Sequence, residues 1–170
     1  MSGTRYIIVG FVVLIIQLLI CEFVNIWPPI YITILPLFIL LLPTSLSTIV
    51  LLPSAFALGI LVDALADGIL GLNAASLTAT AYTKMFFINR LTKYDSRELS
   101  EGIEEFSKKS SKMFLLILFS YIVFFIFYTL LDGIGSGNIL FVTIRLIINV
   151  LINTLIAFGL ERLWIRKTFS

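Results

Sequence analysis

Long apolar runs, interrupted only by short polar stretches, dominate this sequence. The first run begins at Tyr6, and its core holds a single polar side chain, Gln17. Backbone that faces hydrocarbon must satisfy its own hydrogen bonds, so such segments cross a bilayer as helices or as a closed barrel. The strands of a barrel would alternate in character over about ten residues, and these runs do not. The sequence therefore predicts an all-α integral membrane protein, embedded in a lipid bilayer.

The composition leads to the same class. Hydrophobic residues make up 59% of the chain and charged residues 13%, whereas a soluble domain keeps roughly a quarter of its residues charged. The chain has no histidine and one cysteine, Cys21. These counts exclude an internal disulfide and a zinc cluster, and they remove the commonest general base. We expect no metal, no cofactor and no nucleic-acid partner.

Prolines, glycines and polar residues divide the runs into a bundle of about six transmembrane helices within one membrane domain, residues 1–170. Pro28-Pro29 opens the second helix, since proline is tolerated in a first turn. We expect Pro36 to kink that helix and Pro53 to bend the third. The expected spans are 6–23, 29–42, 46–65, 71–88, 113–131 and 139–160.

Residues 89–112 form the one sizeable polar segment of the sequence. Asp95 and Glu98 fit a helix-capping arrangement, and Leu99, Ile103 and Phe106 recur on one helical face. We expect a cytoplasmic elbow helix that lies on the membrane surface. A segment that docks a partner is the alternative.

Lysine and arginine are segregated along the chain. Arg5, the 89–112 segment and the C-terminal tail are basic, whereas the loops at 22–29, 63–71 and 132–138 contain neither Lys nor Arg. Basic residues stay on the cytoplasmic side of membrane proteins. We therefore expect both termini in the cytoplasm and the 63–71 loop outside.

That outer loop holds the most informative residues. Asp63 and Asp67 stand one helical turn apart at the end of an apolar helix, which breaks at Gly68 and Gly71 before an Ala/Ser/Thr-rich helix begins. Charge at the end of a membrane helix is costly unless it reaches water or a partner, so acids at this place indicate a use. The alternative is that both aspartates stop a helix at the water interface.

A polar stripe runs along the last span. Arg145, Asn149 and Asn153 recur every four residues, so they share one helical face. We predict that Arg145 contacts Asp63, with snorkelling of Arg145 to outer headgroups as the alternative. We expect both asparagines to form interhelical hydrogen bonds.

Catalysis is not expected. The two aspartates lie on one segment instead of converging from different helices, and no nucleophile has a base beside it. Proton or ion coupling stays open. We predict instead a structural or partner-binding junction, formed by Gly59, Asp63, Asp67, Gly68, Gly71, Asn73, Arg145 and Asn149.

The pattern Gly59-x-x-x-Asp63, Gly68, Gly71-Leu72-Asn73-Ala74 and a following Ala/Ser-rich helix with Tyr82 resembles the rod shape-determining protein MreD family. Members often carry His at the position of Asn73. The resemblance implies a non-enzymatic, multi-pass scaffold of the bacterial inner (cytoplasmic) membrane, within the cell-elongation machinery that makes lateral peptidoglycan. The implied partners are an MreC-like periplasmic protein, an MreB-like filament and a peptidoglycan glycosyltransferase–transpeptidase pair.

A second resemblance is to the substrate-binding membrane subunit of energy-coupling-factor vitamin transporters. Those subunits usually present an alanine-x-x-x-alanine surface on their first helix, and the first helix of this chain has no alanine. The scaffold is therefore the preferred interpretation. An unrelated small channel or exporter is the third.

Overall fold

The computed structural model describes residues 3–24, 30–42, 46–67, 69–92, 110–133 and 139–168. Within these ranges the chain is helical, with no strand, which confirms the all-α class. The elements are α1 (Gly3–Phe23), α2 (Leu35–Leu41), α3 (Thr48–Val62), the π-helical turn η1 (Asp63–Asp67), α4 (Leu72–Thr92), α6 (Ser110–Asp132) and α7 (Ile139–Thr168).

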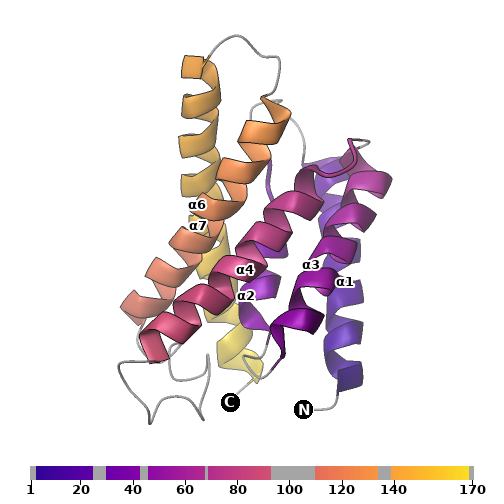
Figure 1. Cartoon of the computed structure of the whole chain (residues 1–170), viewed down its shortest axis with the longest axis vertical. Coiled ribbons are helices and arrows are strands. Elements are labelled where there is room, and N and C mark those ends of the chain that lie inside the picture. The colour runs from indigo at the N-terminus through magenta and orange to yellow at the C-terminus, as the bar shows by residue number, and fades with distance from the viewer. Residues whose placement is uncertain are drawn as a thin grey trace.

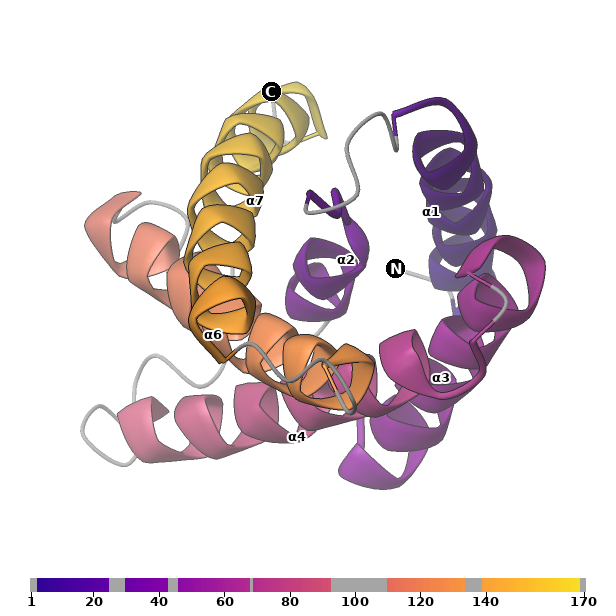
Figure 2. The same ribbon diagram turned by 90° about the horizontal axis from the view of Figure 1, so that it is seen from above.

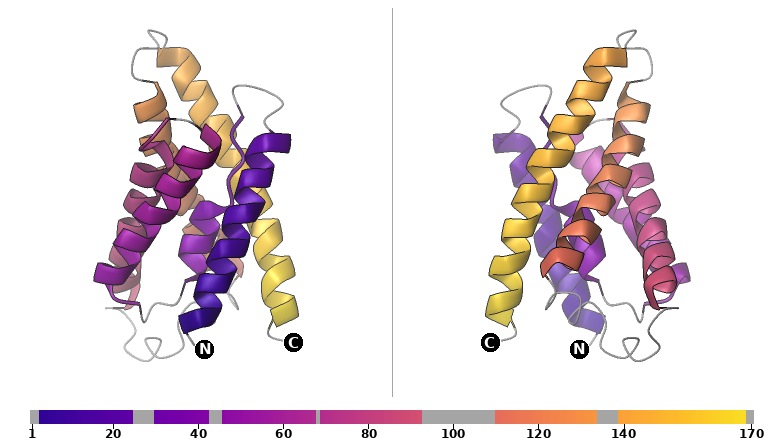
Figure 3. Two further views of the ribbon diagram at one scale, coloured as in Figure 1. Left: turned by 90° about the vertical axis from the view of Figure 1, so that its right-hand side faces the viewer. Right: turned by 90° about the vertical axis from the view of Figure 1, so that its left-hand side faces the viewer.

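The long helices surround the short one. Seen from above, α1, α3, α4, α6 and α7 are arranged around α2 (Figure 2). Neighbours in this arrangement are mostly neighbours in the chain, since α3 packs on α4, α4 on α6 and α6 on α7. The first turn of α1 and the last turn of α7 lie at the same end of the bundle, and η1 lies at the opposite end (Figures 1 and 3).

The outer surface of the bundle is apolar. Large hydrophobic side chains on α1 and α7 are exposed, among them Ile7, Phe11, Leu140 and Leu155. Three described helices, Thr48–Ala66, Met113–Asp132 and Ile139–Leu163, are long and apolar enough to cross a membrane, and Ile7–Phe23 is a shorter apolar helix. Contiguous exposed apolar surface of this kind is unfavourable in water. These features are those of a membrane protein.

The second expected span differs from the prediction. A helix over 29–42 with a kink at Pro36 is wrong, because residues 30–34 form no helix and only Leu35–Leu41 is helical. Pro36 stands in the first turn of α2, where its missing N–H has no helical partner to lose. The proline therefore begins a short helix. Pro28-Pro29 lies outside the described residues.

The other helices are longer than expected at several ends. α4 continues to Thr92 and α6 begins at Ser110, so both edges of the expected 89–112 elbow belong to long helices. The remainder of that elbow lies outside the described residues. α7 extends to Thr168, beyond the expected end at 160. Pro53 lies inside α3, which stays helical on both sides of it.

The core is built around α2. Leu35, Leu37 and Ile39 of α2 are almost completely buried and belong to one apolar cluster with Phe124 and Phe125 of α6. Aromatic rings line the α6 side of this core, where Tyr128 stacks on Tyr31 with ring centroids 4.7 Å apart. A short helix buried on all sides is thus held by the faces of its long neighbours.

Gly59 permits a close approach of α3 to the start of α4. A Cβ atom at this position would lie 2.4 Å from the Cα and 2.5 Å from the amide nitrogen of Ala74, at the start of α4. Real side chains do not approach backbone so closely, and the contacted atoms cannot rotate away. Glycine is therefore required where α3 meets the first turn of α4.

We predict that Gly59→Ala lowers the free energy of unfolding by about 3 kcal/mol, at the upper end of the cost of overpacking. The reason is that α3 must shift away from α4. The measurement is thermal unfolding of the purified protein in detergent. Gly159→Ala on α7 is the matched control, because a Cβ there meets no atom within 4 Å. Equal stability of the two variants would contradict the prediction.

Candidate functional site

Residues 30–34, which form no helix, lead into α2 inside the helix bundle. We call this stretch of backbone the extended segment. Tyr31 and Thr33 in this segment are buried. A helix satisfies its own N–H and C=O groups, but an extended chain inside a membrane protein must find partners elsewhere. The partners of this segment are side chains from three helices.

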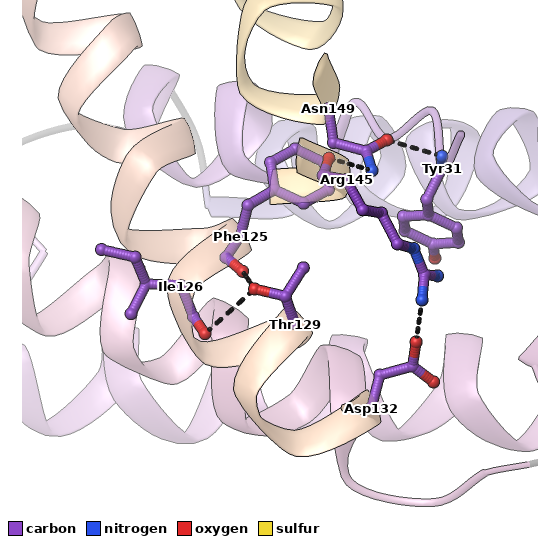
Figure 4. A network of polar contacts seen from close by, with 7 residues as sticks. All are labelled: Tyr31, Phe125, Ile126, Thr129, Asp132, Arg145 and Asn149. Atoms are coloured by element: carbon purple, nitrogen blue, oxygen red, sulfur yellow. Dashed lines mark hydrogen bonds and ion pairs between the residues drawn. The ribbon is translucent and has the colours of Figure 1, made fainter. Parts of the chain in front are cut away.

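Two asparagines of α7 hold one edge of the extended segment. The Asn149 side-chain oxygen accepts a hydrogen bond from the Tyr31 N–H at 2.7 Å (Figure 4). Asn153 makes two bonds to this segment, since its Nδ2 donates to the Tyr31 carbonyl at 2.8 Å and its Oδ1 accepts from the Thr33 N–H at 2.8 Å. The two asparagines therefore bond across the bundle, to extended backbone and not to another helix.

Gln17 of α1 and Tyr121 of α6 complete the set of partners. Gln17 donates from Nε2 to the Ile32 carbonyl at 3.1 Å and accepts from the Ile34 N–H at 2.9 Å. The Tyr121 hydroxyl donates to the Thr33 carbonyl at 2.9 Å. The carboxamide groups of Gln17 and Asn153 each offer an NH₂ that donates and a carbonyl oxygen that accepts. These side chains thus take the place that neighbouring strands would have in a sheet.

Asp63 holds the start of α4. Its buried carboxylate accepts hydrogen bonds from the N–H groups of Gly71 and Asn73, each at 2.9 Å, and of Ala74 at 3.2 Å. The Asn73 Nδ2 donates a fourth bond at 2.9 Å. The first N–H groups of a helix have no partner within it, and its N-terminus favours negative charge. Gly71 enters this turn with φ of +107°, which suits glycine.

Asn73 joins the Asp63 site to the extended segment. Its side-chain oxygen accepts a hydrogen bond from the Tyr31 hydroxyl at 3.1 Å, while its Nδ2 binds Asp63. One connected set of buried polar groups therefore runs from η1 through α4 to the extended segment and on to α1 and α7. We call this set the polar junction: Gln17, Tyr31, Asp63, Asn73, Tyr121, Asn149 and Asn153.

The predicted contact between Arg145 and Asp63 is wrong. Arg145 instead forms an ion pair and hydrogen bond with Asp132, in the last turn of α6 (Figure 4). The side chains of this pair are each 21% exposed. Asp63 is buried and already accepts four N–H groups from the start of α4, so it does not need a cation. Asp132, by contrast, lies where α6 ends beside α7.

A second buried polar contact lies at the other end of α2. Lys84 of α4 is 2% exposed, and its ammonium donates to the carbonyl oxygens of Ile39 at 2.9 Å and Leu42 at 2.6 Å. Carbonyls at a helix C-terminus lack helical partners and carry partial negative charge. Lys84 therefore caps the end of α2.

The structure brings together five of the predicted site residues. Asp63, Gly71 and Asn73 are in direct contact, Gly59 packs beneath them, and Asn149 joins them through Tyr31. Asp67 ends η1, and Gly68 lies outside the described residues. Arg145 is separate from Asp63. Residues that the sequence analysis did not include in the site are Gln17, Tyr31, Lys84, Tyr121, Asp132 and Asn153.

The side chains of this site hold two stretches of backbone in place by hydrogen bonds, the start of α4 and the extended segment. The hydrogen bonds of the Asp63 carboxylate go to the start of α4, and those of Gln17 and Asn153 go mainly to the extended segment. Within the described ranges, no group of three or more His, Cys, Asp and Glu residues has the proximity needed to hold a metal ion. The polar junction joins six segments to one another: α1, the extended segment, η1, α4, α6 and α7.

An open groove lies on the outer surface, beside the polar junction. It has a volume of about 530 Å³ and runs between α3, α4 and α6. Leu52 and Phe56 of α3 and Phe127 of α6 line it, together with five residues of α4, which we call its floor: Ala75, Thr78, Ala79, Tyr82 and Thr83. The floor residues Thr78 and Thr83 donate their hydroxyls to carbonyls of α4 itself, so the groove is almost entirely apolar. We call it the α4 groove.

We predict that Asp63→Asn destabilises the protein by about 3 kcal/mol, the scale of lost hydrogen bonds to a buried charge. A carboxamide keeps one oxygen but turns an NH₂ group toward N–H donors that need an acceptor. Thermal unfolding in detergent measures the loss. Asp132→Asn is the control, since its partly exposed pair with Arg145 is worth about 1 kcal/mol or less. Similar losses in both variants would refute the assigned role of Asp63.

We predict that Asn153→Leu costs about 2–5 kcal/mol, because it leaves the Thr33 N–H and the Tyr31 carbonyl without their partner. Hydrogen–deuterium exchange of the peptide that covers residues 30–34 should become faster. Thr143→Val is the control on the same helix, since that exposed hydroxyl bonds only to the Ile139 carbonyl of α7. Unchanged exchange in Asn153→Leu would rule out the proposed support of the extended segment.

Comparison of the chain with protein-family models, with curated proteins and with solved structures found no match.

Proposed function

We propose that this chain is a non-enzymatic membrane scaffold that holds partner transmembrane helices in the bacterial inner membrane. The observation that carries the proposal is the use of the buried polar groups. Asp63, Gln17 and Asn153 bind the chain's own backbone, which favours a rigid body over a reaction centre. The α4 groove offers that rigid body an apolar outer surface.

The proposed role is in cell elongation and lateral peptidoglycan synthesis. Its support is the resemblance of the Gly59–Tyr82 pattern to the MreD family. Four residues of that pattern have one joint structural use at the start of α4: Gly59, Asp63, Gly71 and Asn73. The proposed partners are the MreC-like protein, the MreB-like filament and the glycosyltransferase–transpeptidase pair.

The proposed topology has both termini in the cytoplasm and about six membrane crossings. The extended segment together with α2 supplies the second crossing. The first turn of α1 and the last turn of α7 lie at the same end of the bundle (Figure 3). Helical turns near that end contain Arg5, Lys112 and Arg162. Asp63 and Asp132 are at the opposite end. This distribution of charge supports a cytoplasmic position for the first end.

We propose that the α4 groove is where a partner helix packs. Ala75, Ala79 and Thr83 recur every four residues along its floor. In membranes, where hydrophobic burial does not drive association, small residues at this spacing let helices approach closely. Large side chains on either side of the floor, Phe56 and Phe127, would contact the flanks of an incoming helix.

A vitamin-transporter subunit is the second candidate, because one observation favours it. Broken helices inside a bundle are typical of transporters, which use them to bind substrate and ions. The extended segment and α2 form such a broken helix. In this chain, however, the residues of α2 pack into the core.

We predict that depletion of the protein in its native bacterium produces rounded cells, and that the wild-type chain co-purifies with elongation proteins. Ala79→Leu fills the floor of the α4 groove without touching the core. It should fold normally, fail to restore rod shape, and reduce co-purified partner about tenfold, the effect of 1–2 kcal/mol of overpacking at an interface.

Gly159→Leu is the matched control, since it adds the same side chain at an open position on α7. It should restore rod shape. Normal cell shape on depletion, combined with loss of vitamin uptake or with co-purified ATPase subunits, would overturn the scaffold in favour of the transporter subunit. Full restoration by Ala79→Leu would exclude the groove as the docking surface.

A further inference from the structure

The ammonium of Lys84 is buried, and no carboxylate in the described part of the chain forms an ion pair with it. Its partners are two backbone carbonyls, those of Ile39 and Leu42. The ion pair in the described part of the chain joins Arg145 and Asp132 and does not involve Lys84. A buried cation is strongly disfavoured unless something compensates its charge. In this structure the end of a helix provides that compensation.

The end of α2 has the features of a cation site. α2 ends at Leu41, and the Leu42 N–H bonds back to the Phe38 carbonyl. The neighbouring carbonyls of Ile39 and Leu42 point to one ammonium, at 2.9 and 2.6 Å. Discontinuous helices of transporters bind coupling cations with the C-terminal carbonyls of half-helices in the same manner. Here the cation belongs to α4.

We propose that the C-terminal end of α2 is a binding site for a primary ammonium group, and that Lys84 is its permanent, covalently attached occupant. The two carbonyls accept hydrogen bonds from two of the three N–H donors of an ammonium. Because the ammonium is tethered to α4, the site neither takes up nor releases a free cation. α2 is therefore locked in place as a structural element.

This inference goes beyond the proposed scaffold function and does not depend on the identity of any partner. It concerns the broken helix, which is the feature that the scaffold and transporter interpretations share. A transporter needs this element to change its state when a ligand binds. Because the Lys84 ammonium cannot leave the end of α2, binding and release of a free cation there cannot change the state of α2.

Chemical rescue tests the proposal directly. Lys84→Ala removes three methylene groups and the ammonium beyond Cβ, and n-propylammonium is the missing fragment. We expect Lys84→Ala to lower the apparent Tm in detergent by about 5–10 °C, from the loss of a buried charged hydrogen-bonding group in a chain of this size. We expect n-propylammonium chloride to restore at least half of that loss, with saturation.

Three controls separate the charge from other effects. n-Propanol has the same length without the charge and should not rescue Lys84→Ala. The wild-type chain, whose site is filled, should not respond to n-propylammonium. Lys112→Ala removes a positive charge at the start of α6, and its Tm should not respond either. Rescue by n-propanol as effective as that by n-propylammonium would overturn the proposal, because the site would then select for volume alone.

Two further variants keep the test decisive if Lys84→Ala does not fold. Lys84→Met keeps a long apolar stem and loses the ammonium, so its Tm should fall well below that of the wild type. Lys84→Arg keeps a cation with N–H donors and should stay within a few degrees of it. A Lys84→Met protein as stable as the wild type would overturn the proposal, since the two carbonyls would then have no need of a cation.

Discussion

The fold depends on one constraint, the need of the extended segment for hydrogen-bond partners in a place without water. Residues 30–34 cannot satisfy their own backbone, so the rest of the bundle supplies donors and acceptors to them. Gln17, Tyr121 and Asn153 come from three helices, and each points to this one stretch of chain. The positions of α1, α6 and α7 around the centre follow from these contacts as much as from apolar packing.

The same physics recurs at helix ends, where backbone groups also lack partners. Asp63 supplies negative charge to the first N–H groups of α4, and Lys84 supplies positive charge to the last carbonyls of α2. Each charge has the sign that the helix dipole favours. Both are buried, and in both cases backbone groups, not an opposite charge, provide the stabilisation. Asp63 and Lys84 are thereby structural, and they join α3 to α4 and α4 to α2.

The sequence was sufficient to predict the class and most of the helices, because long apolar runs allow few alternatives. It was also sufficient to single out Gly59, Asp63, Gly71 and Asn73, since glycine and acid are unusual inside such runs. The partner of Asp63 was not predictable, because charge pairing suggested Arg145 whereas backbone N–H groups satisfy it. The extended segment was missed as well. The sequence Tyr31-Ile32-Thr33 lies in an apolar run like those that form the helices. Only Gln17 and Asn153, elsewhere in the chain, indicate that its backbone needs partners.

The hydrogen bonds between α7 and the extended segment also have a consequence for the order of membrane insertion. Asn149 and Asn153 bind residues that precede them by 118 and 120 positions, so the extended segment is synthesised long before these partners exist. During synthesis, the backbone of residues 30–34 must remain in contact with water, with the insertion machinery or with a helper protein until the last helix has emerged. The bundle can therefore close only after translation is nearly complete. In a chain truncated before α7, the backbone of the extended segment would lack the hydrogen-bond partners that Asn149 and Asn153 supply.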